Sequence, residues 1–203
     1  MEAIEIQTLK EKLGDALTEN LFQHHKIYRL PSYGEYLEEM ISKSFTDIGE
    51  NHIWEPDRSH KVSTDITLES GSTASVKSGQ YNLQKNNLTF SGSRLGQYSS
   101  IEDKLRAIIS QSADFYICVA KIDSDWKPVP KKIDKKKYYL FMFSSEILDY
   151  DNHKWVPKKT KNGNENYEMD VNGFSASIRA SMSHQLWTTI SLSKIGDPIT
   201  IIV

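Results

Sequence analysis

The 203-residue sequence is poor in the features that mark several large classes of protein. Its single cysteine, Cys118, allows neither an internal disulfide nor a cysteine-based metal cage. No stretch approaches the roughly 20 apolar residues that cross a membrane. With 25 basic and 27 acidic residues, the chain lacks the overall positive field of a non-specific DNA coat protein. Glycine-rich phosphate loops, histidine-based zinc spacings and internal repeats are absent as well.

Length and composition indicate the localisation and the number of domains. The first six residues, MEAIEI, lack the basic-then-apolar order of a secretory signal, so we expect a cytoplasmic protein without membrane contact. A chain of 203 residues with 38% hydrophobic content suffices for one buried core, so we expect a single domain over residues 1–203. Cys118 lies in the apolar run FYICVA and is expected to be a buried strand residue.

The spacing of apolar residues predicts an α/β (α+β) chain with a central mixed β-sheet flanked by helices. Helices are predicted at residues 4–21, 35–45 and 101–110. Strands are predicted at residues 62–68, 74–76, 88–95, 115–122, 138–143, 167–171 and 198–203. We expect an interruption of the first helix near Gly14 and a polar loop over residues 149–163.

Two helix starts are expected from capping signals. Ser32 and Glu35 have the spacing of a capping box ahead of the second helix. Near the end of the chain, Ser183 is expected to cap a short helix that begins at His184.

The stretch from Lys61 to Gly79, KVSTDITLESGSTASVKSG, carries the densest chemical signal in the chain. It predicts two short strands joined by a turn at Gly71. In the first strand apolar and polar residues alternate, which puts Asp65 on the polar face. The second strand alternates in the same way, so Lys77 and Asp65 converge on one face if the two strands pair.

A carboxylate and an ammonium held together on a hairpin can bind a metal ion and activate a water molecule. Asp65 would offer a divalent metal an ionised oxygen ligand at low entropic cost, because a strand already fixes its backbone. Lys77 could orient or deprotonate a water, or neutralise charge on a phosphate. The same pattern is also typical of a solvated surface ion pair, which contributes little to stability.

Asp65 followed by Ser75-Val76-Lys77 resembles the D…(D/E)XK signature of the PD-(D/E)XK nuclease superfamily. Ser75 is a departure, because the family usually has a second carboxylate there, although some of its restriction enzymes carry that acid on a helix and keep Ser in the strand. Asp57 also follows a proline, but it precedes the apolar alternation and is expected to be a turn residue, so Asp65 is preferred.

The second carboxylate has to come from elsewhere in the chain. In this superfamily the helix before the hairpin often carries a Gly, an apolar residue and a Glu that reaches the metal. Gly34, Leu37 and Glu38 match that loose pattern, and Glu38 lies beside the apolar stripe of the predicted helix. Glu102 or Asp103 on the later helix is the alternative.

The resemblance implies a type II restriction endonuclease that depends on Mg²⁺. Asp65 and Glu38 would hold the metal, Lys77 would assist the attacking water, and Ser75 would be at most a secondary hydrogen-bonding group. The reaction would hydrolyse phosphodiester bonds of double-stranded DNA at a short palindromic site.

The implied restriction-endonuclease-like catalytic core covers about residues 34–122 of the single endonuclease domain. Residues 123–203 would then add recognition and dimer contacts. One active centre per chain and a palindromic site match a homodimer with two-fold symmetry.

Several polar residues are candidates for contact with DNA. Arginine can pair with guanine and an amide with adenine, each pair discriminating by about 1–3 kcal/mol. The candidates are Arg94, Ser91, Ser93, Arg179, His184 and Gln185. The stretch around the last three could equally be a partly buried sheet edge. The lysine-rich run over residues 127–137 could be a solvated loop or could touch phosphates.

Two alternative functions stay open at this point. One is a repair or junction nuclease of the same superfamily. The other is a DNA-binding or protein-interaction module that keeps the fold without the chemistry, for which Ser75 is the best argument.

Overall fold

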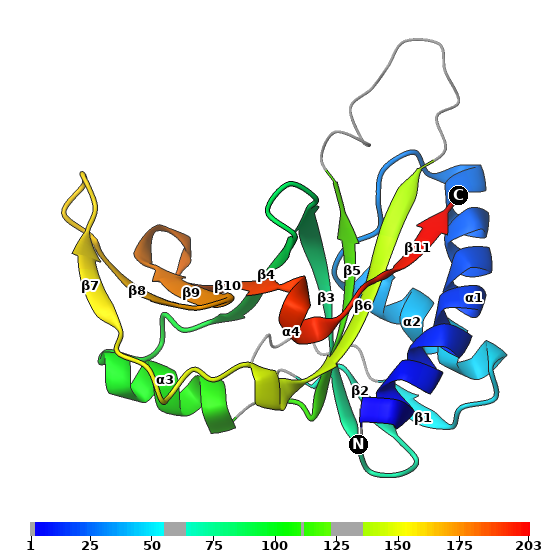
Figure 1. Ribbon diagram of the computed structural model, residues 1–203, viewed down its shortest axis with the longest axis horizontal. Coiled ribbons are helices and arrows are strands. Elements are labelled where there is room, and N and C mark those ends of the chain that lie inside the picture. The colour runs from blue at the N-terminus through cyan, green and yellow to red at the C-terminus, as the bar shows by residue number, and fades with distance from the viewer. Residues whose placement is uncertain (1–2, 55–63, 111, 123–135) are drawn as a thin grey trace.

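The computed structural model describes residues 3–54, 64–110, 112–122 and 136–203. It is an α+β structure in which one 11-stranded mixed sheet has helices on both faces (Figure 1). The expected central mixed sheet flanked by helices is therefore confirmed. Within the described residues, no helix combines the length and apolar character needed to cross a membrane.

In the described part of the chain, the elements are helices, strands and short 3₁₀ turns. In order they are α1 (Ala3–Ile27), α2 (Glu35–Asp47), β1 (His52–Trp54), β2 (Ile66–Leu68), β3 (Thr73–Asn82), β4 (Asn87–Arg94), α3 (Ile101–Ser110), β5 (Phe115–Lys121), β6 (Lys137–Ser144), η2 (Ser145–Ile147), β7 (Val156–Lys159), β8 (Glu165–Val171), β9 (Phe174–Arg179), η3 (Ala180–Met182), β10 (Gln185–Ser191), α4 (Leu192–Ile195) and β11 (Ile199–Ile202).

Strands β5, β3 and β4 lie next to one another in the interior of the sheet. Its order is β11-β6-β5-β3-β4-β10-β9-β8-β7; β2 pairs with the start of β3, and β1 pairs with β2. β3 and β5 are parallel, and α3 lies between β4 and β5 along the chain. The C-terminal strands extend the sheet on both sides, since β6 and β11 lie beyond β5 whereas β10 to β7 lie beyond β4.

Alternating side chains of the central strands separate two hydrophobic cores. On β5, Phe115, Ile117 and Val119 face the core that contains α1 and α2, and Cys118 is buried in the other core, as predicted. The other core holds the apolar side of α3 and the strands of the C-terminal extension. A strand buried on both faces is uniformly apolar, which explains the run FYICVA.

The sheet forks between β3 and β4. These strands form a hairpin, and their ladder runs only from Asn82↔Asn87 to Gly79↔Phe90. Beyond Gly79, toward its N-terminal end, β3 pairs with β2 and β5, whereas the rest of β4 pairs with β10. The two strands therefore diverge below their shared turn (Figure 1), and the backbone between them opens.

Two expectations about the helices are wrong. α1 runs unbroken through Gly14, because Leu13, Leu17 and Leu21 are fully buried and their packing outweighs a glycine penalty of about 1 kcal/mol. The proposed capping box does not form, since Gly34, with φ 52°, is the N-cap residue of α2 and no side chain caps it.

Two expectations about the C-terminal part are also wrong. Ser183 caps no helix: it and His184 both have a φ of 55°, and strand β10 begins at the next residue. Pairing of β10 with both β4 and β9 outweighs the local capping signal. The expected loop over residues 149–163 contains the edge strand β7, because it pairs with β8. Asp57 and most of the lysine-rich run lie outside the described residues.

Gly79 stands where the sheet forks, so its replacement tests this packing. A Cβ at this position would lie 3.1 Å from the Thr89 carbonyl oxygen and 3.0 Å from Leu88 Cδ1. We expect Gly79→Ala to lower the free energy of unfolding by about 1–3 kcal/mol, measured by urea denaturation. Ser78→Ala, which adds no volume on the same strand, is the control and should change it by less than about 0.5 kcal/mol. Equal stability of the two variants would contradict close packing at the fork.

Candidate active site

Asp65 is placed by an extension of the β2–β3 ladder. Its backbone N–H donates to the Ala74 carbonyl oxygen at 2.9 Å. Ile66 pairs with Ala74, so the same antiparallel register puts Asp65 opposite Ser75. Ser75 and Lys77 share one face of β3, which brings all three side chains together. The predicted convergence of Asp65 and Lys77 is confirmed.

Three donors converge on a single oxygen of the Asp65 carboxylate. Oδ2 accepts from the Ser75 hydroxyl at 3.1 Å, from the Val76 backbone N–H at 2.6 Å and from Lys77 Nζ at 3.4 Å. The Lys77 ammonium also donates to the Val76 carbonyl oxygen at 3.1 Å. The side chains of Lys77 and Asp65 are only 19% and 15% exposed, so this pair differs from a solvated surface ion pair. These bonds fix Asp65 through Oδ2, and Oδ1 takes part in none of them.

Glu38 approaches this pair from helix α2. It follows the buried Leu37 and is itself partly buried, whereas Glu39 is exposed, as the helical spacing predicted. Burial raises the pKa of Glu38, and the nearby charges of Asp65 and Glu35 raise it further. Lys77 lowers it in part. The carboxyl of Glu38 is therefore costly to ionise in the absence of a cation.

A buried indole lies at the same place. Trp54 on β1 is close enough to lower the pKa of Glu38, yet among the described residues its Nε1 has no hydrogen-bond partner within ordinary geometric limits. A buried donor without a partner costs about 1–3 kcal/mol, so a small shift of the Glu38 carboxylate that closed this bond would be favourable.

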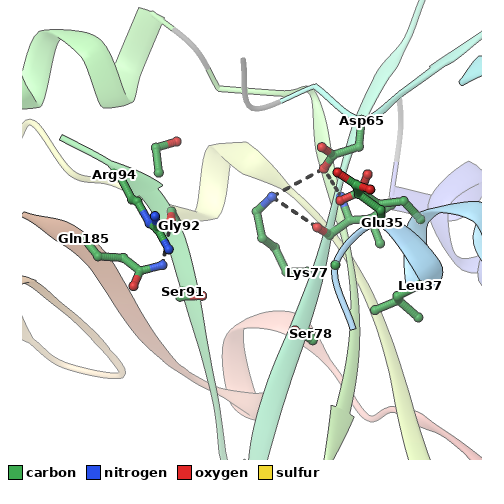
Figure 2. Close-up of a pocket in the computed structure, with 13 residues that line it drawn as sticks. Glu35, Leu37, Asp65, Lys77, Ser78, Ser91, Gly92, Arg94 and Gln185 are labelled. Carbon is green, nitrogen blue, oxygen red and sulfur yellow. Dashed lines mark hydrogen bonds and ion pairs between the residues drawn. The ribbon is translucent and has the colours of Figure 1, made fainter. Parts of the chain in front are cut away.

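The side chains of Glu38, Asp65 and Lys77 line one wall of a cleft of about 350 Å³ that occupies the fork of the sheet. Figure 2 shows Lys77 reaching toward Asp65, with Glu35 beside them and with Arg94 and Gln185 on the strands across the cleft. The cleft is lined by Gly34, Glu35, Leu37, Glu38, Asp65, Val76, Lys77, Ser78, Ser91, Gly92, Ser93, Arg94 and Gln185. Residues from α2, β3, β4 and β10 therefore meet in one space.

The far wall is polar and carries no acidic residue. Ser91, Ser93 and Arg94 come from the part of β4 that no longer pairs with β3. Gln185 comes from β10, and its Nε2 donates to the Gly92 carbonyl oxygen at 3.5 Å. Hydroxyl, amide and guanidinium groups are donors that suit phosphate oxygens and base edges.

Two predicted DNA contacts lie outside this cleft. The Arg179 guanidinium stacks over the Trp187 ring at 5.1 Å, and its Nε donates to the Ser177 hydroxyl at 3.4 Å. The His184 carbonyl oxygen accepts from the Leu95 backbone N–H at 3.2 Å, and the His184 side chain is not among the residues that line the cleft.

The rival second carboxylates are placed on α3, away from the lining residues. Asp103 belongs to the start of that helix, where its N–H donates to the Ser100 hydroxyl at 3.0 Å and its Oδ2 accepts from that hydroxyl at 2.8 Å. Glu102 lies near Tyr167 on β8, whose pKa it helps to raise. Of the three candidates, Glu38 is the one that lines the cleft with Asp65.

Sequence reasoning missed Glu35, Ser78 and Gly92 as lining residues. A signal for Glu35 was present, because residues three apart share a helix face and Glu35 precedes Glu38 by three. Ser78 on β3 and Gly92 on β4 line a cleft because the two strands diverge beyond Gly79↔Phe90. No local sequence pattern predicts where two paired strands diverge.

The donor set of the cleft fits a hard cation that keeps much of its water. Among the residues that the structure describes, no three His, Cys, Asp or Glu side chains cluster closely enough to enclose a metal. Mg²⁺ commonly uses one or two carboxylates, several waters and substrate phosphates rather than an all-protein cage. Glu38 and Asp65 match that requirement, whereas they could not satisfy a tetrahedral zinc site.

The raised pKa of Glu38 predicts a pH-dependent cost to stability. Because the folded pKa exceeds the unfolded one, the cost appears as the pH rises above the ordinary value of 4.5 and is absent below it. We expect Glu38→Gln to stabilise the metal-free protein at pH 7, by up to about 2 kcal/mol, and to have no effect in acid. Urea denaturation across pH measures this difference.

Glu39→Gln is the matched control, because it removes the same charge from the exposed side of α2. It should change the free energy of unfolding by less than about 0.5 kcal/mol at any pH. A Glu38→Gln variant that is less stable than the wild type at pH 7 would show that the carboxylate is not held at a cost.

In comparisons with known proteins, no family model, curated protein or solved structure matches this chain. The function of the cleft therefore has to be argued from its geometry and chemistry.

Proposed function

We propose that the chain is a Mg²⁺-dependent endonuclease that hydrolyses phosphodiester bonds of double-stranded DNA at a short sequence, with its active centre in the cleft at the fork. The observation that carries the proposal is the meeting of Glu38 of α2, Lys77 of β3 and Asp65, the residue before β2, opposite a wall that holds Arg94. Acids and a lysine on one side and phosphate-binding donors on the other are what metal-assisted phosphodiester hydrolysis requires.

The arrangement of the elements adds support. α2, β2, β3, β4, α3 and β5 follow one another in the order that the resemblance to PD-(D/E)XK nucleases implies for a catalytic core. β5 is parallel to β3, the strand that carries Lys77, and is its neighbour in the sheet. The finer assignment to a restriction-endonuclease-like core is part of this proposal.

Each residue of the near wall has a role in the proposed reaction. Glu38 and Asp65 would hold Mg²⁺, which when bound lowers the pKa of its water and neutralises phosphate charge. Lys77 would orient the attacking water and stabilise the charge that develops on the phosphate. Ser75 would act through Asp65, because its buried hydroxyl holds Oδ2. In-line attack on phosphorus would leave a 5′-phosphate and a 3′-hydroxyl.

The far wall would bind the DNA. Arg94 can contact a phosphate or pair with guanine, and Gln185 can read an adenine edge. Ser91 and Ser93 would donate hydroxyl hydrogen bonds to the backbone of the same strand. With one such centre per chain, cutting both strands of a palindromic site requires two copies related by a two-fold axis, so we propose a homodimer.

The direct test is incubation of the purified protein with a mixed-sequence plasmid, with and without Mg²⁺. Discrete fragments that appear only with Mg²⁺ support the proposal, and the sequence of their ends gives the site. Intact plasmid with Mg²⁺ and with Mn²⁺ contradicts it.

Lys77→Ala separates chemistry from binding. We expect cleavage to fall by about 10²- to 10⁴-fold, while the affinity for a duplex that contains the site changes little, because Lys77 contributes mainly at the transition state. Lys85→Ala, which removes an exposed lysine from the β3–β4 turn, is the control and should cleave normally. Circular dichroism checks that both variants fold. Normal cleavage by a folded Lys77→Ala variant would remove Lys77 from the mechanism.

One observation favours a second candidate, a DNA-binding module without catalysis. Among the described residues, no group of three His, Cys, Asp or Glu side chains is placed to enclose a metal ion, and Ser75 occupies the position of the usual second carboxylate. Sequence-specific binding of duplex DNA without cleavage in any divalent metal would establish this alternative.

A further inference from the structure

The segment that joins α1 to α2, together with the first turn of α2, exposes three tyrosine side chains beside the cleft. Tyr28 is 57% exposed, Tyr33 46% and Tyr36 74%. Gly34 and Glu35, which lie between the last two tyrosines, line the cleft itself. Tyr28, Tyr33 and Tyr36, here named the aromatic strip, therefore lead from the α1 end of the segment to the mouth of the candidate active site.

The strip is held in place by histidines of α1. His25 Nδ1 lies 2.8 Å from the Tyr28 carbonyl oxygen, and His25 Nε2 lies 2.7 Å from the Tyr138 hydroxyl. Burial lowers the pKa of His25 to about 4, so at neutral pH an uncharged ring can donate to Tyr28 and accept from Tyr138. His24 Nε2 lies 3.1 Å from the Leu30 carbonyl oxygen. The backbone at Tyr28 and Leu30 is thus fixed by α1, and Tyr36 is fixed by its place in α2, which reduces the entropy cost of binding.

Basic residues flank the aromatic strip. Residues 22–34 include Lys26 and Arg29 and no acidic residue, so the positive charge lies along Tyr28 and Tyr33, whereas Tyr36 follows Glu35. Lys136 donates to the Arg29 carbonyl oxygen from the start of β6. Lys121, at the end of β5, donates to the Tyr33 hydroxyl at 3.3 Å and lies 5.5 Å from the centre of its ring. A polymer with regularly spaced negative charges and flat apolar groups complements such a surface.

We propose that the aromatic strip binds unpaired nucleotides of a DNA strand that leaves the cleft, with bases stacked on Tyr33 and Tyr36 and phosphates against Arg29 and Lys121. Paired bases are already stacked on one another and cannot offer their faces, so the ligand is single-stranded. This inference rests on the proposed function for the identity of the polymer. It extends that function by giving the chain a surface for a strand that unpairs beside the scissile bond when the duplex is bound.

The test uses the full chain, metal-free buffer with a chelator, and a fluorescein-labelled oligothymidine whose binding is followed by anisotropy. We expect saturable binding that weakens as salt rises. In the double variant Tyr33→Ser/Tyr36→Ser the affinity should fall about five- to hundredfold, the usual effect of removing a base-stacking ring. Both side chains are exposed, so circular dichroism and thermal unfolding should match the wild type.

Two controls isolate the aromatic strip from other surfaces and from the chemistry. Leu83→Ser removes a side chain that is 58% exposed at the tip of the β3–β4 hairpin and should bind the oligonucleotide normally. Asp65→Asn should also bind it normally while losing Mg²⁺-dependent plasmid cleavage, so failure of the proposed chemistry and failure of this inference are distinguishable.

Two results would overturn the inference. The first is no binding of oligothymidine by the wild type, or equal binding by the wild type and the double variant. The second is a change from dimer to monomer in the double variant, by light scattering, with oligonucleotide binding unaltered. That result would assign the aromatic strip to a second copy of the chain.

Discussion

The early end of the β3–β4 ladder is the constraint on which the site depends. If pairing continued past Gly79↔Phe90, the half of β4 that carries Ser91 and Ser93 would lie against β3 and no cleft would exist. Each diverging strand is instead paired on its other edge, β3 with β5 and β4 with β10. On the edge of β3 that faces the fork, side chains replace a partner strand, since the Val76 N–H donates to Asp65 and the Val76 carbonyl oxygen accepts from Lys77. The opening is thus stable because the sheet is wide on both sides of it.

The two carboxylates of the cleft differ in how far the surrounding groups stabilise their negative charge. Asp65 is satisfied through one oxygen by Ser75, Val76 and Lys77, whereas Glu38 sits partly buried with a raised pKa among other carboxylates. Carboxylates held at a cost are common at functional sites, where a bound cation relieves the repulsion. The buried indole N–H of Trp54, which has no hydrogen-bond partner among the described residues, is a second polar group beside Glu38 that the isolated chain holds at a cost.

Local periodicity predicted much of this site, and it failed where distant parts of the chain decide. Strand alternation placed Asp65 and Lys77 on one face, and helical spacing turned Glu38 toward the core, and both positions are confirmed. The juxtaposition of Gln185 with β4 could not be predicted, because strand pairing across about ninety residues leaves no local signal. His184 shows the opposite failure, a capping signal overruled by that pairing. The catalytic and DNA-binding roles remain predictions.

We propose that Glu38 and Asp65 together form a cation site, and titration with Mn²⁺ followed by electron paramagnetic resonance is the measurement that tests this proposal. Mn²⁺ accepts the same oxygen ligands as Mg²⁺, and its signal distinguishes bound from free ion. We expect the wild type to bind one Mn²⁺ per chain in a saturable way, with an affinity that falls as decreasing pH protonates Glu38. Binding should be lost in Asp65→Asn, weaker in Glu38→Gln and unchanged in Glu39→Gln. Equal Mn²⁺ binding by the wild type and Asp65→Asn, or no binding by either, would contradict the proposal.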